Sequence, residues 1–229
     1  MTAIPTRPHV LMMSEITVDG KLTLKRGASS KILMQHMAPE TEVLLHQTRA
    51  ECGAIMVGSR TIAIDNSYLT VRLVEGKSPL RVIPSSMAAI SPDANVLNSD
   101  APTLVAVSRA APEERVAAIR AKGADVVVCG KEHVDLPALM QVLREDYGVE
   151  KMMIEGGPTL NWHMLRHGLV DDIRLIHLPF IVGGEDTPSL VGGMHIESED
   201  EMIRLDLKKY YMCGTNLVTE YTVQYGNNE

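Results

Sequence analysis

Aromatic residues are scarce in this chain of 229 residues: six Tyr, one Trp and one Phe make up 3 % of it. Valine, leucine, isoleucine and 14 methionines must therefore fill the core, and methionine does so as a flexible, unbranched side chain. The hydrophobic share is nevertheless 45 %, so a chain of this length can bury a full core without metals or disulfides. Disordered, collagen-like and coiled-coil architectures are excluded.

Cysteine and long apolar runs are lacking as well. Cys52, Cys129 and Cys213 lie far apart without Cys-x-x-Cys spacing, which argues against both a zinc site and a disulfide framework. Their odd number fits a reducing compartment. No stretch approaches the roughly 20 apolar residues of a membrane helix, and the first residues lack the apolar segment of a signal peptide. We expect a cytoplasmic protein without a membrane partner.

Positive charge is in deficit, with 22 Lys and Arg against 29 Asp and Glu and a net charge of −7. This balance argues against a nucleic-acid partner, although a local basic pocket for a phosphorylated small molecule remains compatible with it. His163 and His167 have the i, i+4 spacing of metal ligands but no third ligand beside them. We therefore expect a pair on a helix surface and no metal.

Short apolar segments alternate with helical segments along most of the chain. Strands are expected at residues 9–13, 54–58, 80–84, 103–107, 125–129 and 151–154. Helices are expected near 30–38, from a cap at Thr41 to about Glu51, and at 112–122, 136–147 and 158–167. Three further strands, at 173–179, 204–211 and 216–225, follow without a helix of comparable length between them. The order predicts one α/β domain over residues 1–229, with a mostly parallel sheet, flanking helices and an antiparallel C-terminal edge.

The strongest single motif is Ile-Glu-Gly-Gly-Pro-Thr-Leu-Asn at residues 154–161. An apolar strand runs into Gly156 and Gly157, and Pro158 suits the first position of a helix. The free N–H groups and positive dipole end of such a helix suit a pyrophosphate. An ordinary strand-to-helix turn has the same pattern, and the dinucleotide fingerprint G-x-G-x-x-G is absent.

A second polar segment follows the strand expected at 54–58, where α/β sheets bind their ligands. Thr61 and Asp65 are four residues apart and would share a helix face, and Arg72 could bind phosphate through two hydrogen bonds. The pattern alone slightly favours a solvated surface loop. Residues 17–21, Thr-Val-Asp-Gly-Lys, are by themselves typical of a turn followed by an exposed lysine.

Taken together in their order and spacing, these segments resemble the pyrimidine reductases of riboflavin biosynthesis, a family with a dihydrofolate-reductase-like fold. The resemblance runs from about residue 7 to residue 225, in particular to the stand-alone, archaeal-type reductases of 2,5-diamino-6-ribosylamino-4(3H)-pyrimidinone 5′-phosphate. It is carried by residues 17–21, 49–72, 81, 155–161, 168–172 and 182–184. Two departures stand out: Ser85 replaces a usual Asp, and Asn66-Ser67 replaces Asp-Pro.

The resemblance implies reduction of a ribosylamino group to ribitylamino, with NADPH delivering hydride to C1′ of the ribose. The implied cofactor contacts are Thr61, Asp65, Ser85, Ser86, Gly156, Gly157, Pro158, Thr159, Leu160 and Asn161. The implied substrate contacts are Ser29, Arg49, Leu69, Arg72 and Glu155. Lys21 and Glu155 are the catalytic candidates, Lys21 to polarise or protonate near C1′ and Glu155 to anchor polar groups of the substrate. A homodimer is implied as well.

Two other functions stay open at this point: a dihydrofolate-reductase-like oxidoreductase for another pterin or pyrimidine, and a nucleotide-binding domain without turnover. Arg49 and Arg72 argue for a phosphorylated substrate and so against the first. Lys21 and Glu155, retained beside the cofactor motif, argue against the second. The sequence alone leaves open whether the pyrimidine is the diamino or the deaminated form, and whether NADPH or NADH is preferred.

Overall fold

The computed structural model describes residues 6–225, which form two compact units. Within the described residues, the first unit consists of residues 6–9 together with Val43–Ile154, and the second of Val10–Glu42 together with residues 155–225. Each unit thus combines two separate segments of the chain. That all 229 residues act as one domain stays a prediction.

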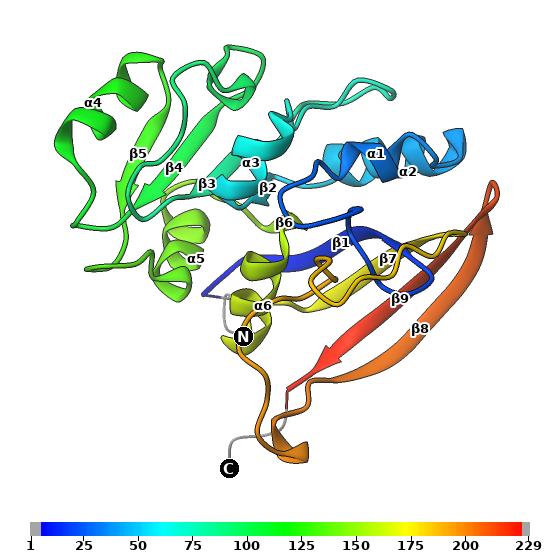
Figure 1. Ribbon diagram of the computed structural model, residues 1–229. Coiled ribbons are helices and arrows are strands. Elements are labelled where there is room, and N and C mark those ends of the chain that lie inside the picture. The colour runs from blue at the N-terminus through cyan, green and yellow to red at the C-terminus, as the bar shows by residue number, and fades with distance from the viewer. Residues whose placement is uncertain (1–5, 226–229) are drawn as a thin grey trace, which may run out of the picture. The chain divides into compact units, whose positions relative to one another are not determined.

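The first unit is built on parallel strands in the order β5-β4-β3-β2-β6 (Figure 1). Its strands are β2 (Ala54–Val57), β3 (Leu80–Pro84), β4 (Thr103–Val107), β5 (Asp125–Val128) and β6 (Lys151–Gly156), the last ending in the second unit. Its helices are α3 (Ser59–Asp65), η1 (Asn95–Leu97), α4 (Glu113–Ala121) and α5 (Leu136–Glu145), and α2 (Pro39–Ala50) enters it from the second unit. The bounds of β3 and β4 are those expected from the sequence.

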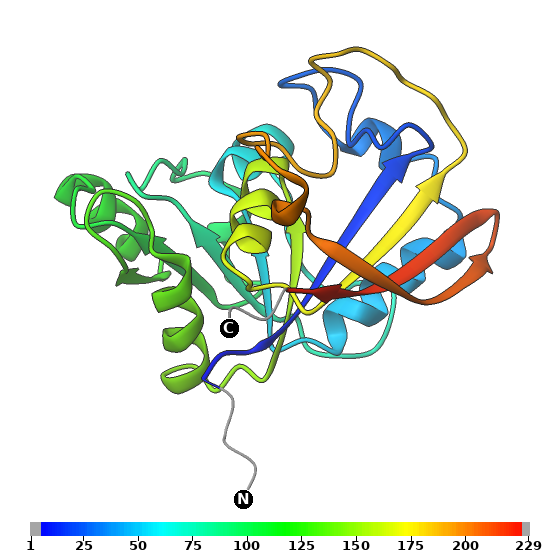
Figure 2. The same ribbon diagram turned by 90° about the horizontal axis from the view of Figure 1, so that it is seen from below.

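In the second unit, β1 (His9–Thr17) pairs in parallel with β7 (Asp172–Leu178), and the two run side by side in Figure 2. Strands β9 (Asn216–Gln224) and β8 (Arg204–Cys213) continue the order β1-β7-β9-β8 with antiparallel pairing. The helices are α1 (Lys31–Met34), α6 (Pro158–Arg166) and η2 (Glu199–Glu201). Mostly parallel strands with an antiparallel C-terminal edge confirm the predicted α/β class.

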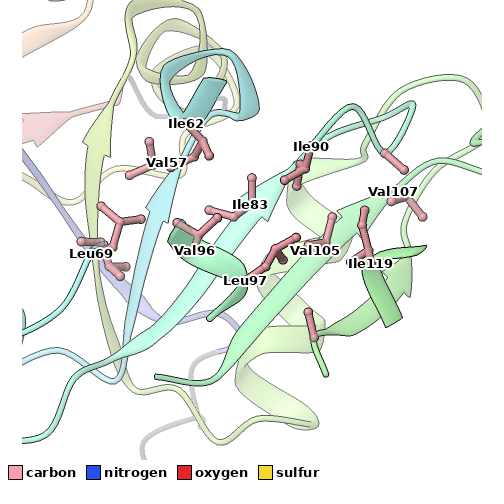
Figure 3. Packing of buried hydrophobic residues seen from close by; sticks show 13 residues of the cluster. Val57, Ile62, Leu69, Ile83, Ile90, Val96, Leu97, Val105, Val107 and Ile119 are labelled. Atoms are coloured by element: carbon pink, nitrogen blue, oxygen red, sulfur yellow. The ribbon is translucent and has the colours of Figure 1, made fainter. Parts of the chain in front are cut away.

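Alternate residues of β2, β3 and β4 point into one apolar cluster of the first unit (Figure 3). Ile83 at its centre is fully buried, and Ile62 of α3 and Leu69 of the following loop pack into the same cluster. The remaining members are Ile55, Val57, Ala88, Ile90, Val96, Leu97, Val105, Val107, Ile119 and Ala124. Packing against this cluster fixes the position of two segments that carry candidate site residues.

Methionine fills much of the core, as the shortage of aromatic residues predicted. The fully buried side chains include Met12 and Met13 of β1, Met56 of β2, Met140 of α5 and Met152 of β6. An unbranched thioether adapts to the irregular gaps that a bulky ring would otherwise fill. No helix in the part of the chain that the structure describes is both long and apolar enough to cross a membrane.

Two local expectations were wrong. The segment after β2 is helix α3 over Ser59–Asp65, not a solvated loop, because Ile62 gains a buried position in the core. Helix α2 begins at Pro39, two residues before the expected cap at Thr41. The amide oxygen of Asn216, from β9, accepts hydrogen bonds from the Ala38 N–H and the Thr41 hydroxyl at 2.8 Å each, so a distant side chain organises this helix start.

Candidate functional site

Helix α3 carries Thr61 and Asp65 at the carboxyl end of β2. The two residues lie one helical turn apart and share a face, as their spacing predicted. Asp65 is buried at 7 % exposure, whereas Thr61 is half-buried. The helix ends at Asn66 in the left-handed conformation, whose N–H donates to the Ile62 carbonyl at 2.9 Å. The hydroxyl of Thr61 is thus presented at a strand end.

Ser85 and Ser86 follow β3 at the same edge of the first unit. The Ser85 hydroxyl accepts the N–H of Ala89 at 2.9 Å, and the Ser86 hydroxyl accepts the N–H of Val134 at 3.0 Å. The carbonyl of Ser86 accepts the hydroxyl proton of Ser108 at 2.8 Å. Both serines therefore order neighbouring loops, and each hydroxyl keeps its own proton to donate.

Two guanidinium groups meet at Thr70. Arg49, at the end of α2 and 5 % exposed, donates from Nη1 to the Thr70 carbonyl at 3.1 Å. The exposed Arg72 donates from Nη1 to the Thr70 hydroxyl at 2.7 Å, and its N–H donates to Nδ1 of His46 at 3.0 Å. Leu69, beside them, is buried at a φ of +53°. The structure thus brings the guanidinium groups of Arg49 and Arg72 to the same residue, and guanidinium groups are well suited to bind phosphate.

The start of α6 lies in the second unit. Gly157 is the N-cap residue and provides no side-chain cap, and Pro158 occupies the first turn. Gly156 has a φ of +93°, and a Cβ there would lie 3.4 Å from the side-chain amide of Asn161. Thr159 is exposed, whereas Leu160 is buried. The N–H groups of this first turn thus have no capping side chain to bind.

Asn161 is fully buried under that helix start. Its Nδ2 donates to the Leu190 carbonyl at 2.8 Å and so ties α6 to the segment that follows β7. Its Oδ1 finds no hydrogen-bond partner within the described residues. A buried acceptor without a partner carries a desolvation penalty unless a ligand or water satisfies it.

Lys21 and Asp19 lie in the turn after β1. The Lys21 N–H donates to the Thr17 hydroxyl at 2.9 Å, and Nζ donates to the Thr187 carbonyl at 3.3 Å. The Thr17 hydroxyl, and next the N–H of Gly183, lower the pKa of Asp19 from 3.8 to about 2, while burial opposes the shift. Asp19 is thus firmly ionised at neutral pH.

The two remaining candidates also lie in the second unit. Glu155 is half-buried near the end of β6. The Ser29 hydroxyl accepts the N–H of Lys31 at 3.2 Å, and the Ser29 carbonyl accepts the hydroxyl proton of Thr23 at 3.1 Å. Both side chains are accessible enough to contact a ligand. Their assignment to a substrate site, like the joint assignment of all these residues to one site, stays a prediction.

The RibD C-terminal domain family matches residues 8–219. This chain belongs to that family. Among solved structures, the RibD protein of Acinetobacter baumannii aligns over 96 % of this chain with a TM-score of 0.80 at 20 % identity. This chain spans 58 % of that longer one, and the likeness shows the shared fold alone.

Two relatives align with almost the whole of this chain. A protein of Aquifex aeolicus is 48 % identical over 95 % of this chain and 97 % of its own length. A protein of Methanothermobacter thermautotrophicus is 44 % identical over 95 % of this chain and 99 % of its own. Both are named 2,5-diamino-6-ribosylamino-4(3H)-pyrimidinone 5′-phosphate reductase.

Arg81 has no role among the residues expected to form the site, and this RibD-family chain buries it completely. Its guanidinium donates to the Thr103 hydroxyl at 2.9 Å, to Oδ1 of Asn98 at 2.8 Å and to the Tyr68 carbonyl at 3.3 Å, and also bonds the Ala101 carbonyl. Burial lowers its pKa, with the Asp100 charge acting in the opposite direction. Arg81 thereby anchors the loop that carries Leu69. A cation within the apolar strand Leu80–Pro84 was the available signal.

Proposed function

We propose that this chain reduces 2,5-diamino-6-ribosylamino-4(3H)-pyrimidinone 5′-phosphate in riboflavin biosynthesis, converting its ribosylamino group to ribitylamino. The observation that carries the proposal is 44–48 % identity to two reductases of that name over almost the full length of both chains. Each member of the Arg49 and Arg72 pair provides a planar set of donors, which supports a phosphorylated substrate over a free pterin.

NADPH is the cofactor that we propose, and when bound it supplies the hydride. The uncapped start of α6 fits its pyrophosphate, because first-turn N–H groups and the helix dipole favour an anion. The hydroxyl protons of Ser85 and Ser86 fit the polar groups of a nucleotide. The residues that would hold it are Thr61, Asp65, Ser85, Ser86, Gly156, Gly157, Pro158, Thr159, Leu160 and Asn161.

The substrate would be held through its phosphate by Arg49 and Arg72, with Leu69, Ser29 and Glu155 contacting the rest of it. The Leu69 side chain is buried in the core cluster, so Leu69 would contact the substrate through its backbone, which lies beside the two guanidinium groups. Glu155 has a carboxylate that can accept hydrogen bonds from the amino groups of the pyrimidine or from hydroxyl groups of the sugar. These contacts orient the sugar for reaction at C1′.

The reduction at C1′ requires one proton, which the protein has to donate. As C1′ gains a hydride, the ring oxygen leaves as the 4′-hydroxyl and takes up that proton. In this proposal the Lys21 ammonium group donates it, because Lys21 is a cation held at a defined place by the Thr187 carbonyl. The product is the ribitylamino pyrimidine phosphate.

The test is oxidation of NADPH, followed by its absorbance, with the diamino pyrimidine phosphate and with its deaminated form in parallel. We expect turnover, with a higher kcat/KM for the diamino compound and for NADPH over NADH. Turnover of the deaminated compound alone would reassign the substrate. Turnover of dihydrofolate but of neither pyrimidine would contradict the proposal, as would tight NADPH binding without turnover of any of them.

We also propose that the chain works in the cytoplasm as a homodimer. The β8–β9 hairpin supports the second point, because apolar side chains lie exposed along one of its faces. Tyr210 is 71 % exposed, Met212 63 % and Leu207 55 %. The β-bulge between Leu207 and Lys209 adds one residue to β8 and so shifts the side-chain alternation by one position. As a result Leu207, which pairs with Tyr221, lies on the same face as Tyr210, which pairs with Thr219. Such a stripe suits the surface of a second copy.

A further inference from the structure

One carboxylate, that of Asp19, joins two loops of the second unit. Its Oδ1 accepts the hydroxyl proton of Thr17 at 2.6 Å and the N–H of Val182 at 3.2 Å. Its Oδ2 accepts the N–H of Gly183 at 2.7 Å. All three partners are donors, so this position requires a group that offers only acceptors on both atoms. An aspartate meets that requirement, and an asparagine does not.

Lys21 is held at both ends by the same arrangement. Its N–H donates to the Thr17 hydroxyl, which leaves the hydroxyl proton directed at Asp19. Its Nζ donates to the carbonyl of Thr187, whose own N–H donates to the Gly184 carbonyl at 3.3 Å. These contacts form a closed ring. It runs from the Lys21 N–H through the Thr17 hydroxyl to Asp19, then along residues 182–187 to the Thr187 carbonyl and back to the Lys21 ammonium group.

The second loop, residues 182–187, turns at a position that favours glycine between the point that Asp19 holds and the point that Lys21 contacts. Gly184 has a φ of +78°, and a Cβ added to it would lie 2.4 Å from Oγ1 of the buried Thr187. The N–H of Leu22 donates to the Pro188 carbonyl at 2.9 Å, and Lys21 forms an antiparallel bridge with Ser189. Residues 182–187 thus connect the two N–H groups that Asp19 binds to the carbonyl that the Lys21 ammonium group contacts.

We propose that Asp19 is a positioning residue, which fixes the Lys21 ammonium group for its part in the reduction. Asp19 does this without touching the reacting atoms, through Thr17 on one side and the segment 182–187 on the other. The role rests on the proposed function, in which Lys21 donates the proton at the sugar.

The test compares Asp19→Asn with the wild type in the full chain. Asparagine keeps the size of the side chain but sets an NH2 group against an N–H or O–H donor. Asp186→Asn is the matched control, because Asp186 is an exposed carboxylate of the same loop without a hydrogen-bond partner among the described residues. The control makes the same change of charge and shape, and we expect wild-type behaviour from it.

Two readouts do not depend on activity. Amide hydrogen exchange at Val182 and Gly183 should accelerate in Asp19→Asn by about tenfold or more, the factor for losing one charge-assisted hydrogen bond. Reductive methylation of Lys21, followed by mass spectrometry, should also proceed faster than in the wild type. An unchanged labelling rate of Lys21 would overturn the positioning role, whether or not the wild type reduces the pyrimidine. Absence of turnover in the wild type would instead contradict the proposed function alone.

A double-mutant cycle on kcat separates positioning from a general structural role. Asp19→Asn should lower kcat by about tenfold or more while leaving the KM for NADPH within about twofold. In the Lys21→Met background the same change should leave the residual kcat unaltered, since the group to be positioned is gone. Equal losses in both backgrounds, or an unchanged kcat in the single variant, would overturn the proposal.

A second variant tests the same proposal if Asp19→Asn does not fold. Thr17→Val keeps the shape of the side chain and removes the hydroxyl that joins Lys21 to Asp19. It should shift the Lys21 labelling rate and kcat in the same direction as Asp19→Asn. If folded Thr17→Val has the wild-type labelling rate of Lys21 and the wild-type kcat, these contacts do not position Lys21 and the proposal is wrong.

Discussion

Arg72 is the residue whose role can be tested most directly, because it is exposed while its neighbour Arg49 is buried. Arg72→Ala should raise the KM for the pyrimidine phosphate by about 10- to 150-fold, the cost of a charge-assisted hydrogen bond of roughly 1.5–3 kcal/mol. The KM for NADPH should change little, and Arg72→Lys should recover only part of the loss, since lysine lacks the planar pair of donors. Steady-state kinetics with each substrate varied in turn measures this.

Lys77→Ala is the matched control for Arg72→Ala, because it removes an exposed cation from the same loop. Its kinetic constants should equal those of the wild type. Equal weakening of NADPH and substrate in Arg72→Ala would show that this arginine is structural or binds the cofactor, and would contradict its assignment to the substrate phosphate.

The Asp19 carboxylate predicts a pH dependence of stability. Its pKa in the folded chain is about 2, below the ordinary value of 3.8, chiefly because the Thr17 hydroxyl donates to it. Because the pKa of Asp19 is lower in the folded chain than in the unfolded one, its carboxylate contributes fully to the free energy of unfolding above about pH 4. This contribution is lost as the pH falls toward 2. The difference in free energy of unfolding between wild type and Asp19→Asn should be constant at pH 5–7 and should shrink below pH 4. Denaturant titrations across this range measure it, and a difference that grows with acid would contradict the assigned direction.

Among the elements, the start of α6 allows a substitution that separates ligand binding from folding. Gly157 has a φ of −76°, a conformation open to residues with a side chain, whereas Gly156 at +93° is not. Gly157→Val should therefore abolish NADPH binding in a folded chain, because a branched side chain blocks the approach of pyrophosphate to the first-turn N–H groups. Fluorescence titration with NADPH measures the binding, with circular dichroism to monitor the fold. Wild-type affinity in the folded variant would leave this turn without a role in binding.

Helix α2 depends on a side chain from a strand far away in the sequence. Fully buried Asn216 accepts hydrogen bonds from the Ala38 N–H and the Thr41 hydroxyl, and its Nδ2 donates to the His177 carbonyl at 3.3 Å. Asn216→Ala removes all three hydrogen bonds, including the side-chain acceptor of the Ala38 N–H, and should lower the free energy of unfolding by about 1–3 kcal/mol. The exposed neighbour offers the control Thr215→Ala, expected within about 0.5 kcal/mol of wild type. Urea titration distinguishes the two, and equal stability of both variants would contradict the capping role.

At the scale of the whole molecule, the exposed stripe on the β8–β9 hairpin bears on the homodimer. Tyr210→Glu places a charge within the stripe and should shift the chain from dimer to monomer in analytical ultracentrifugation. Met194→Glu makes a comparable change at a methionine that is 82 % exposed outside the hairpin, and should leave the dimer intact. A wild-type monomer, or a Tyr210→Glu dimer of undiminished affinity, would contradict the assignment of the interface to this hairpin.

Most strands and helices could be predicted from the sequence, because their pattern depends on neighbours a few residues apart. The strand over Leu80–Pro84 shows this, because its mostly apolar residues end at the polar pair Ser85 and Ser86 and its bounds are the same in the structure. Family resemblance supplied the candidate site as a set of residues, and their assignment to one site stays a prediction. The proximity of Arg49 and Arg72 was not predictable, because these residues lie 23 positions apart and meet only where the chain folds back at Thr70.

Composition and short-range periodicity were enough to predict the α/β class and the methionine-rich core, because both are local properties of the chain, whereas the candidate residues came from the family resemblance. Tertiary structure decided where α2 begins, that residues 59–65 are helical and that Arg81 anchors the Leu69 loop. It also decided that Asp19 joins the Lys21 turn to a loop more than 160 residues away. Each of these outcomes depends on a buried position or on a hydrogen bond between distant segments, and periodicity along the chain carries no information about such partners.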